Sequence, residues 1–174
     1  TGGVIELGER RERVGSGGFD FATSGVSLGA DVRLSDQVVV GAGVGLGHDR
    51  SDLGEGSKVE ADAISAFGYG SWKPTELLFL DAVVGFGRLD FDTTRQAAGG
   101  ALLRGSRSGD QWFAAISSGL ENNRDELMLS PYGRVEAMSA RLSEYAEHGD
   151  QAKALRFAAQ NLEQVTGVIG LRGS

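Results

Sequence analysis

Val38-Val39-Val40-Gly41-Ala42-Gly43-Val44-Gly45-Leu46-Gly47 is the stretch that decides the fold. Its even positions hold valine, alanine or leucine, whereas every odd position from 41 to 47 holds glycine. Successive side chains of a β-strand point to opposite faces, so a repeat of two residues predicts a strand with one apolar face and one glycine face.

The same alternation occurs along residues 22–34, 80–87 and 129–138. A soluble sandwich fills its inner face with bulky apolar side chains and places lysine, glutamate and threonine outside. Here the face opposite the apolar one carries glycine, serine and an occasional charge. This composition favours a transmembrane barrel, in which the apolar face meets lipid and the other face lines a lumen.

Short and long connections alternate between these stretches. Short turns are expected at 35–37, 73–76 and 122–126, and longer polar connections at 48–58, 93–110 and 143–153. The alternation predicts an all-β, antiparallel up-and-down meander of the transmembrane β-barrel type. Its eight expected strands are 3–14, 19–34, 38–50, 58–72, 77–92, 108–121, 127–142 and 155–172; the segment 151–161 also fits a short helix.

Composition excludes several classes of protein. The 174 residues include 28 glycines and no cysteine, and the formal net charge is -7 with the basic residues scattered. We therefore expect no nucleic-acid partner, no thiolate metal site and no cysteine nucleophile. No apolar run is long enough for a transmembrane helix. We expect no cofactor and no metal. The only histidines, His48 and His148, are far apart, and the acidic cluster of Asp49, Asp52, Glu55, Glu60 and Asp62 lacks the spacing of an EF-hand calcium site.

One short motif suggests catalysis. Gly25-Val26-Ser27-Leu28-Gly29 matches the nucleophile elbow of esterases and lipases, with Asp81 and His148 following in the chain order of that family. An elbow requires a sharp turn between a strand and a helix, whereas Ser27 lies inside an unbroken alternation. We therefore interpret Ser27 as structural and expect no enzymatic activity.

Aromatic residues stand near the ends of several expected strands. Tyr69 and Trp72 lie near one end, and Phe91 and Trp112 near others. Tyrosine and tryptophan are enriched at both membrane–water interfaces, so these four residues are interpreted as aromatic girdles.

The ordered set of strand motifs resembles the C-terminal β-domain of bacterial autotransporters, the translocator of type V secretion. The resembling segments are 23–31, 40–45, 69–72, 80–87 with Arg95, 129–136 and 168–172. The resemblance covers nearly the whole chain and implies a single partial β-domain over residues 1–174, equivalent to about the first eight of the family's twelve strands.

This resemblance implies an outer-membrane protein of the Gram-negative cell envelope that helps an upstream passenger reach the cell surface and anchors it there. It implies outer-membrane lipid, the passenger segment and the barrel-assembly machinery as partners. Eight of twelve strands leave two edges, which we expect to pair between chains into a homo-oligomer rather than with each other.

The residues expected to line a wet lumen are small or charged. They are Asp31, Arg33, Gly41, Gly43, Gly45, Glu60, Asp62, Gly85, Gly87, Arg134 and Glu136. Two alternatives stay open from the sequence: an esterase or lipase-type hydrolase built on the motif at 25–29, and a soluble β-sandwich or lipid-carrying barrel, which the mean hydropathy of -0.16 supports.

Overall fold

The computed structural model describes residues 2–10, 19–120 and 129–173 and shows ten strands in them. The strands are β1 (Gly2–Arg10), β2 (Phe19–Ser35), β3 (Val38–Asp52), β4 (Lys58–Trp72), β5 (Leu78–Gln96), β6 (Leu102–Leu120), β7 (Leu129–Leu142), β8 (Tyr145–Ala146), β9 (Arg156–Phe157) and β10 (Gln160–Gly173).

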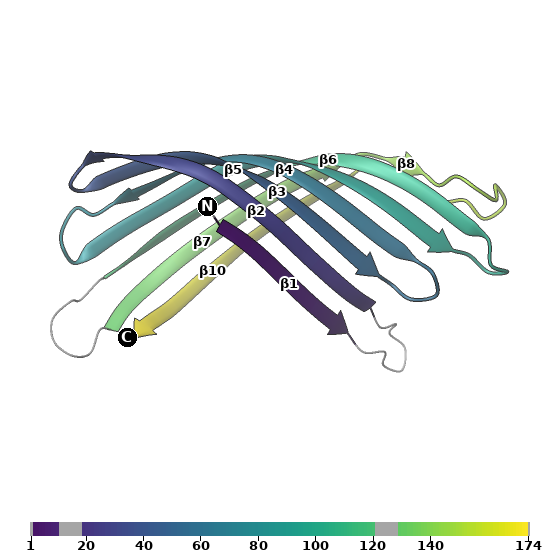
Figure 1. The fold of residues 1–174 in the computed structure, drawn as a ribbon, viewed down its shortest axis with the longest axis horizontal. Helices are drawn as coiled ribbons and strands as arrows, with labels where there is room; N and C mark the ends of the chain where they lie inside the picture. Colours follow the sequence, from purple (N-terminus) through teal and green to yellow (C-terminus); the bar gives the residue numbers. More distant parts are fainter. Residues whose placement is uncertain (1, 11–18, 121–128, 174) are drawn as a thin grey trace.

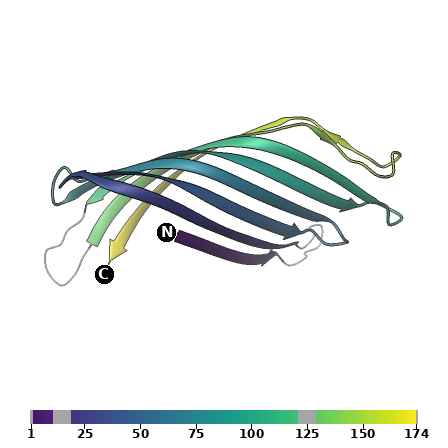
Figure 2. The ribbon, with the colours of Figure 1, turned by 45° about the horizontal axis from the view of Figure 1, so that its top comes forward.

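Eight of these strands form one antiparallel sheet. The spatial order β1-β2-β3-β4-β5-β6-β7-β10 follows the chain, and β8 and β9 form a separate two-stranded hairpin. The long strands run side by side and curve into an arch (Figures 1 and 2). The predicted fold class, an all-β antiparallel meander with eight main strands, is confirmed.

The cross-strand register extends the alternation from one strand to the whole sheet. Gly43 lies opposite Gly29 on one side and Phe67 on the other, while Val44 lies opposite Leu28 and Ala66. Directly opposed residues share a face of a sheet. We call the face that carries Val44 the outward face and the face that carries Gly43 the inward face.

Three connections differ from expectation. The predicted long loop at 93–110 is mostly strand, because β5 and β6 continue to a five-residue turn at 97–101 that contains Gly99 and Gly100 with positive φ. The connection at 143–153 contains β8 and folds back onto the sheet. The segment 151–161 contains no helix. The expected turn at 122–126 lies outside the described residues.

Little of the sheet is buried. In the described part of the chain, only four hydrophobic side chains are buried, namely Phe79, Leu103, Ala140 and Leu142. Large apolar side chains of the outward face remain half exposed, for example Val44 at 53% and Leu46 at 56%. A soluble β-sandwich buries such residues between two sheets, so this arrangement disfavours the soluble alternative.

Candidate functional site

The outward face carries an uncharged belt. On each of five consecutive strands, a nine-residue stretch contributes no charged side chain to this face. These stretches are 26–34 of β2, 38–46 of β3, 64–72 of β4, 78–86 of β5 and 112–120 of β6. The one hydroxyl side chain among them, Ser118, donates a hydrogen bond of 2.9 Å to the backbone carbonyl of Phe79. The belt therefore presents few polar groups to its surroundings.

The dimensions of the belt match a membrane. The eight steps between the first and last residue of each stretch, at about 3.3 Å each, span roughly 26 Å along a strand. The edge of the belt advances by two residues between β4 and β5. Over the four strand spacings from β2 to β6, each about 4.8 Å, this shift corresponds to a slant of the strands of about 20°. The belt is then about 25 Å tall, which matches the ~25 Å apolar band of outer-membrane barrels.

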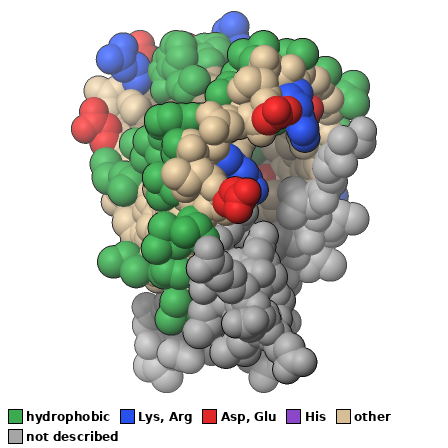
Figure 3. Space-filling model, turned by 90° about the vertical axis from the view of Figure 1, so that its left-hand side faces the viewer, with side chains coloured by type: hydrophobic (Ala, Val, Ile, Leu, Met, Phe, Trp, Pro, Cys, Tyr) green, Lys and Arg blue, Asp and Glu red, His purple; other side chains and the backbone are tan. Residues whose placement is uncertain are grey.

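Tryptophans mark both rims of this belt. Trp72 is half exposed at the rim beside the short turns, and Trp112 lies at the opposite rim with its ring 5.0 Å from that of Phe86. Hydrophobic side chains cover much of the outside in the end view of Figure 3. Tyr69 and Phe91 lie on the inward face instead. The girdle interpretation is therefore wrong for these two residues, because they occupy odd positions and the outward positions of their strands are even.

Beyond the rim at Trp112, the outward face becomes charged. His48 Nδ1 lies 2.8 Å from Asp62 Oδ1, and Arg50 Nε lies 3.5 Å from Glu60 Oε1. Glu60 and Asp62 were expected to line a lumen with nine other residues. Their register partners place them on the outward face, in continuity with Ile64, so these two do not share a face with the other nine.

The other nine expected residues all lie on the inward face. They are Asp31, Arg33, Gly41, Gly43, Gly45, Gly85, Gly87, Arg134 and Glu136. Tyr69 donates a hydrogen bond of 3.0 Å to Asp31, and Arg134 Nε lies 2.5 Å from Glu136 Oε1. A hollow of about 600 Å³ lies over the middle of the sheet and is lined in part by inward side chains such as Ser65 and Phe113.

Several inward glycines make room for aromatic rings of the neighbouring strand. A Cβ atom added at Gly41 would lie 2.3 Å from Tyr69, and one added at Gly85 would lie 2.1 Å from Phe113. These distances are far shorter than any real Cβ contact. The glycines therefore do more than widen the interior, because aromatic rings of the neighbouring strand pack against the sheet in the space that their side chains would fill.

The connection between β7 and β10 folds inward over the extended end of β5 and β6. The β8–β9 hairpin stacks the rings of Tyr145 and Phe157 at 4.6 Å, and Arg107 of β6 lies over the Tyr145 ring. Backbone hydrogen bonds join Arg104 to His148 in both directions. We call residues 143–159 the inward hairpin.

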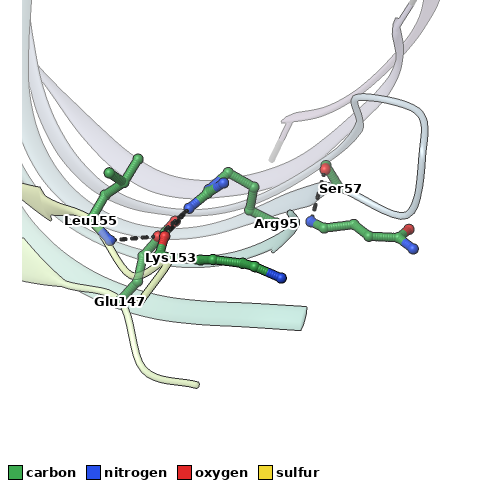
Figure 4. Close-up of polar contacts among 6 residues, drawn as sticks. Ser57, Arg95, Glu147, Lys153 and Leu155 are labelled. Carbon is green, nitrogen blue, oxygen red and sulfur yellow. Dashed lines mark hydrogen bonds and ion pairs between the residues drawn. The ribbon is translucent and has the colours of Figure 1, made fainter. Parts of the chain in front are cut away.

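A buried ion pair fixes this hairpin to the sheet. Arg95 donates two hydrogen bonds to the carboxylate of Glu147, at 2.8 and 2.6 Å, and a third to the carbonyl of Lys153. The Glu147 side chain is 2% exposed and also accepts a hydrogen bond from the backbone of Leu155. Figure 4 shows this group of residues inside the curve of the sheet. Sequence reasoning missed the pair, because 52 residues separate its members.

Hydrogen bonding by Arg95 lowers the pKa of the Glu147 carboxyl, and the backbone hydrogen bond from Leu155 acts in the same direction. Burial opposes both effects, since it disfavours the charged form. The lowered pKa shows that specific contacts outweigh desolvation at this position. The inward hairpin is therefore held by a carboxylate that stays ionised at pH values below those at which a glutamate ordinarily becomes protonated.

The residues of the esterase motif are not brought together. Ser27 lies in the middle of β2 on the inward face, and the nearby His48 lies on the outward face. His148 is held at the inward hairpin by its bridge to Arg104. No strand-to-helix turn is present at 25–29, so the arrangement lacks the geometry of a nucleophile elbow.

Two features are absent from the residues that the structure describes. Within them, no helix has the length and hydropathy needed to cross a membrane. Nor do the described residues contain three or more histidine, aspartate or glutamate side chains grouped as metal ligands.

An antiparallel meander with a membrane-sized outward belt and a polar inward face defines a domain of the outer-membrane β-barrel class. The family model of the autotransporter beta-domain matches residues 2–174. The chain belongs to this family, as the sequence motifs indicated.

Solved structures agree in fold. The chain is similar to the translocator domain of the autotransporter NalP from Neisseria meningitidis, with a TM-score of 0.82 and 16% identity over 90% of this chain and 55% of that one. The chain is also similar to the β-domain of the Bordetella autotransporter BrkA, with a TM-score of 0.68 and 18% identity over 98% of this chain and 68% of that one. The chain thus spans little more than half of the NalP domain. A comparison with curated proteins found no match.

Proposed function

We propose that the chain is the translocator and anchor domain of an autotransporter, which sits in the outer membrane of a Gram-negative cell and helps an upstream passenger segment reach the surface. The observation that carries this proposal is the contrast between the two faces of one sheet. A belt about 25 Å tall faces outward, and a polar, partly charged face lies directly behind it.

The nine inward residues supply the wall of the proposed passage. An extended polypeptide exposes its backbone donors and acceptors, and an interior that contains water and charged side chains satisfies them. The pairs Asp31–Tyr69 and Arg134–Glu136 hold charges on this wall without closing it. No step of this function requires a bond to be made or broken by the chain, so we propose no catalytic role.

The proposal includes three further partners: lipid, the barrel-assembly machinery and a second copy of the chain. Lipid contacts the outward belt, and the barrel-assembly machinery inserts the sheet.

In the described residues β1 and β10 are each paired on one side only. Unpaired backbone groups within a bilayer cost several kcal/mol each, which supports our prediction that these edges pair between chains rather than with each other.

Crosslinking at two neighbouring positions tests the proposal. The chain has no cysteine, so Ser65→Cys and Ala66→Cys each introduce a single thiol, the first on the inward face and the second on the outward face. The protein is expressed from its complete reading frame in a Gram-negative host and treated with a thiol-directed photocrosslinker while the passenger is in transit.

We expect Ser65→Cys to crosslink to the passenger segment and Ala66→Cys to crosslink to lipid. Equal passenger crosslinking at both positions, or crosslinking at position 66 alone, would contradict the proposed passage.

A further inference from the structure

The inward face is covered at one side of its long-connection end and open at the other. On β6 the inward hairpin lies directly on the sheet: a Cβ atom added at Gly105 would lie 2.5 Å from the Tyr145 ring, and Leu103 is fully buried. Ser51 of β3 lies in the same cross-strand row as Gly105 and is only half-buried. The hairpin therefore leaves the inward face of β2, β3 and β4 accessible.

Small side chains line the accessible part. The hollow of about 600 Å³ is lined on these three strands by residues no larger than serine at the inward positions, namely Gly25, Ser27, Gly45, Gly47, Ala63 and Ser65. In the corresponding rows, β5 and β6 carry the larger Leu89, Phe91 and Arg107. We call the inward positions of residues 23–27, 45–51 and 59–65 the open lane.

Glycine in the open lane leaves space that no ring of the domain fills. A Cβ atom added at Gly47 would lie 3.6 Å from the Cβ atom of Ala63, which is an ordinary contact, whereas one added at Gly85 would overlap the Phe113 ring. Glycine within a strand often marks a place where another backbone approaches closely. The lane thus has room for a segment that lies against the sheet.

The open lane also offers hydrogen-bond acceptors. Asp49 is the only charged residue at its inward positions, all of which the structure describes. The carboxylate accepts hydrogen bonds from Thr23 at 2.5 Å and from Ser51 at 3.2 Å, and no ion pair joins it to a cation of the described residues. A carboxylate has about four acceptor positions, so Asp49 retains capacity for the backbone N–H groups of an extended polypeptide.

Chain connectivity favours the same side of the sheet. β1 pairs with β2, beginning with Gly2 opposite Ser27, whereas the inward hairpin lies over β5 and β6. A segment upstream of β1 therefore joins the domain beside the open lane and away from the hairpin.

We infer that the passenger segment runs through the open lane, against the inward face of β2, β3 and β4, and that the inward hairpin confines it there by covering β5 and β6. The inference rests on the proposed function and adds to it the path of the passenger. The occupant is an extended stretch of polypeptide, because the lane offers acceptors and space close to the backbone rather than a pocket for one side chain.

Crosslinking at two positions of one row tests this path. Ser51 of β3 and Thr93 of β5 are both inward and are joined through Val59 of β4. Ser51→Cys and Thr93→Cys each add one thiol to a chain without cysteine. The thiol-directed photocrosslinker is shorter than the roughly 10 Å between the two strands, and the yield of crosslinked passenger is divided by the fraction of labelled thiol.

With the complete reading frame expressed and the passenger in transit, we expect Ser51→Cys to crosslink to the passenger. We expect Thr93→Cys to give no more crosslinking than the outward variant Ala66→Cys. Equal yields at positions 51 and 93, or a higher yield at 93, would overturn the path.

Opening the inward hairpin tests the confinement. Glu147→Gln removes the charge that Arg95 binds, so we expect it to produce crosslinking at position 93 when combined with Thr93→Cys. Glu144→Gln, at an exposed neighbour, is the matched control and is expected to leave position 93 uncrosslinked. If tryptic cleavage shows the hairpin open in Glu147→Gln and position 93 still gives no crosslink, the confinement is overturned.

The proposed function fails in a different way from the path. If neither Ser51→Cys nor Ser65→Cys crosslinks to the passenger, no passenger crosses the inward face at these strands and the proposed passage fails together with this inference. If Ser65→Cys crosslinks but position 93 equals or exceeds position 51, the proposed function stands and the open lane alone is overturned.

Discussion

The two faces of β3 and β4 use the same backbone for opposite purposes. Outward positions such as Val44 and Leu46 are large, apolar and half exposed, whereas inward positions such as Gly43 and Ser65 are small and lie behind aromatic or polar neighbours. In a soluble protein the large side chains would be the buried ones. The inversion supports our proposal that the outward face meets lipid and that the inward face needs room rather than bulk.

The largest expected effect comes from placing a charge on each face. Val44→Arg puts a guanidinium near the middle of the outward belt, and we expect it to lower the free energy of unfolding in lipid by about 2–4 kcal/mol. Ser65→Arg, on the inward face, is the matched control and is expected to cost much less because the side chain reaches water. Denaturant titrations in vesicles measure both.

Spin labels sharpen the same comparison without adding charge. A label at position 44 is expected to be accessible to oxygen dissolved in the bilayer, and one at position 43 to a water-soluble relaxation agent. The assignment of faces is wrong if the two positions show equal accessibility or the reverse order.

The next effect concerns the inward face at its long-connection end. Glu147→Gln removes the charge that Arg95 and the Leu155 backbone bind. Hydrogen bonds to charged groups contribute about 1.5–3 kcal/mol, so we expect the inward hairpin to open at least about tenfold more often. Tryptic cleavage after Lys153 and Arg156 measures this opening, and Glu144→Gln, at an exposed neighbour, is the control.

Acid is expected to act in the same direction as that substitution. The pKa of Glu147 is lowered in the folded protein from its ordinary value of 4.5, so the stabilisation is complete above that value. It is lost as the pH falls through the lowered pKa. Cleavage beside Leu155 or Phe157 by a pepsin-type protease that does not rise as the pH falls from 5 would contradict the role of the ion pair.

Glycine substitutions compare crowding on the two faces. Gly85→Ala brings a Cβ atom against Phe113, and forcing extra carbon atoms into a packed site costs about 1–3 kcal/mol. Nothing lies within 4 Å of the corresponding atom at Gly167, so Gly167→Ala is expected to change stability by less than about 0.5 kcal/mol. Equal effects would show that the Phe113 ring moves aside freely.

Local periodicity accounts for what the sequence could predict. A repeat of two residues fixes the face of each side chain relative to its neighbours on one strand, which is why the strands and nine of the eleven proposed lumen residues could be placed together. Glu60 and Asp62 were placed on the wrong face because their charge was taken to mean that they face the lumen. Their even positions instead place them on the same face as Ile64. Beyond the rim of a membrane belt, charged residues face outward too.

Long-range contacts account for what could not be predicted. The pair Arg95–Glu147 and the burial of Leu103 depend on the inward hairpin folding back across β5 and β6. A repeat of two residues along a strand does not predict where such a connection folds. The extension of β5 and β6 to a turn at 97–101 was missed for a related reason. Polar strands outside a belt have the composition of loops, although Gly99 and Gly100 fit the positive φ of a tight turn.

The smallest expected effect is at Ser27, where the inward face meets the remaining enzymatic hypothesis. Ser27 lies opposite Gly45 within β2, and a hydroxyl on a wet face has water as an alternative partner, so Ser27→Ala is expected to change the free energy of unfolding by less than about 0.5 kcal/mol. An activated serine needs a base within hydrogen-bond reach, and His48 projects from the other face of the sheet. A fluorophosphonate probe is therefore expected to leave position 27 unlabelled in the folded protein, as in Ser27→Ala. Stoichiometric labelling that disappears in Ser27→Ala would restore the hydrolase hypothesis and would require the strand around 25–29 to leave the sheet.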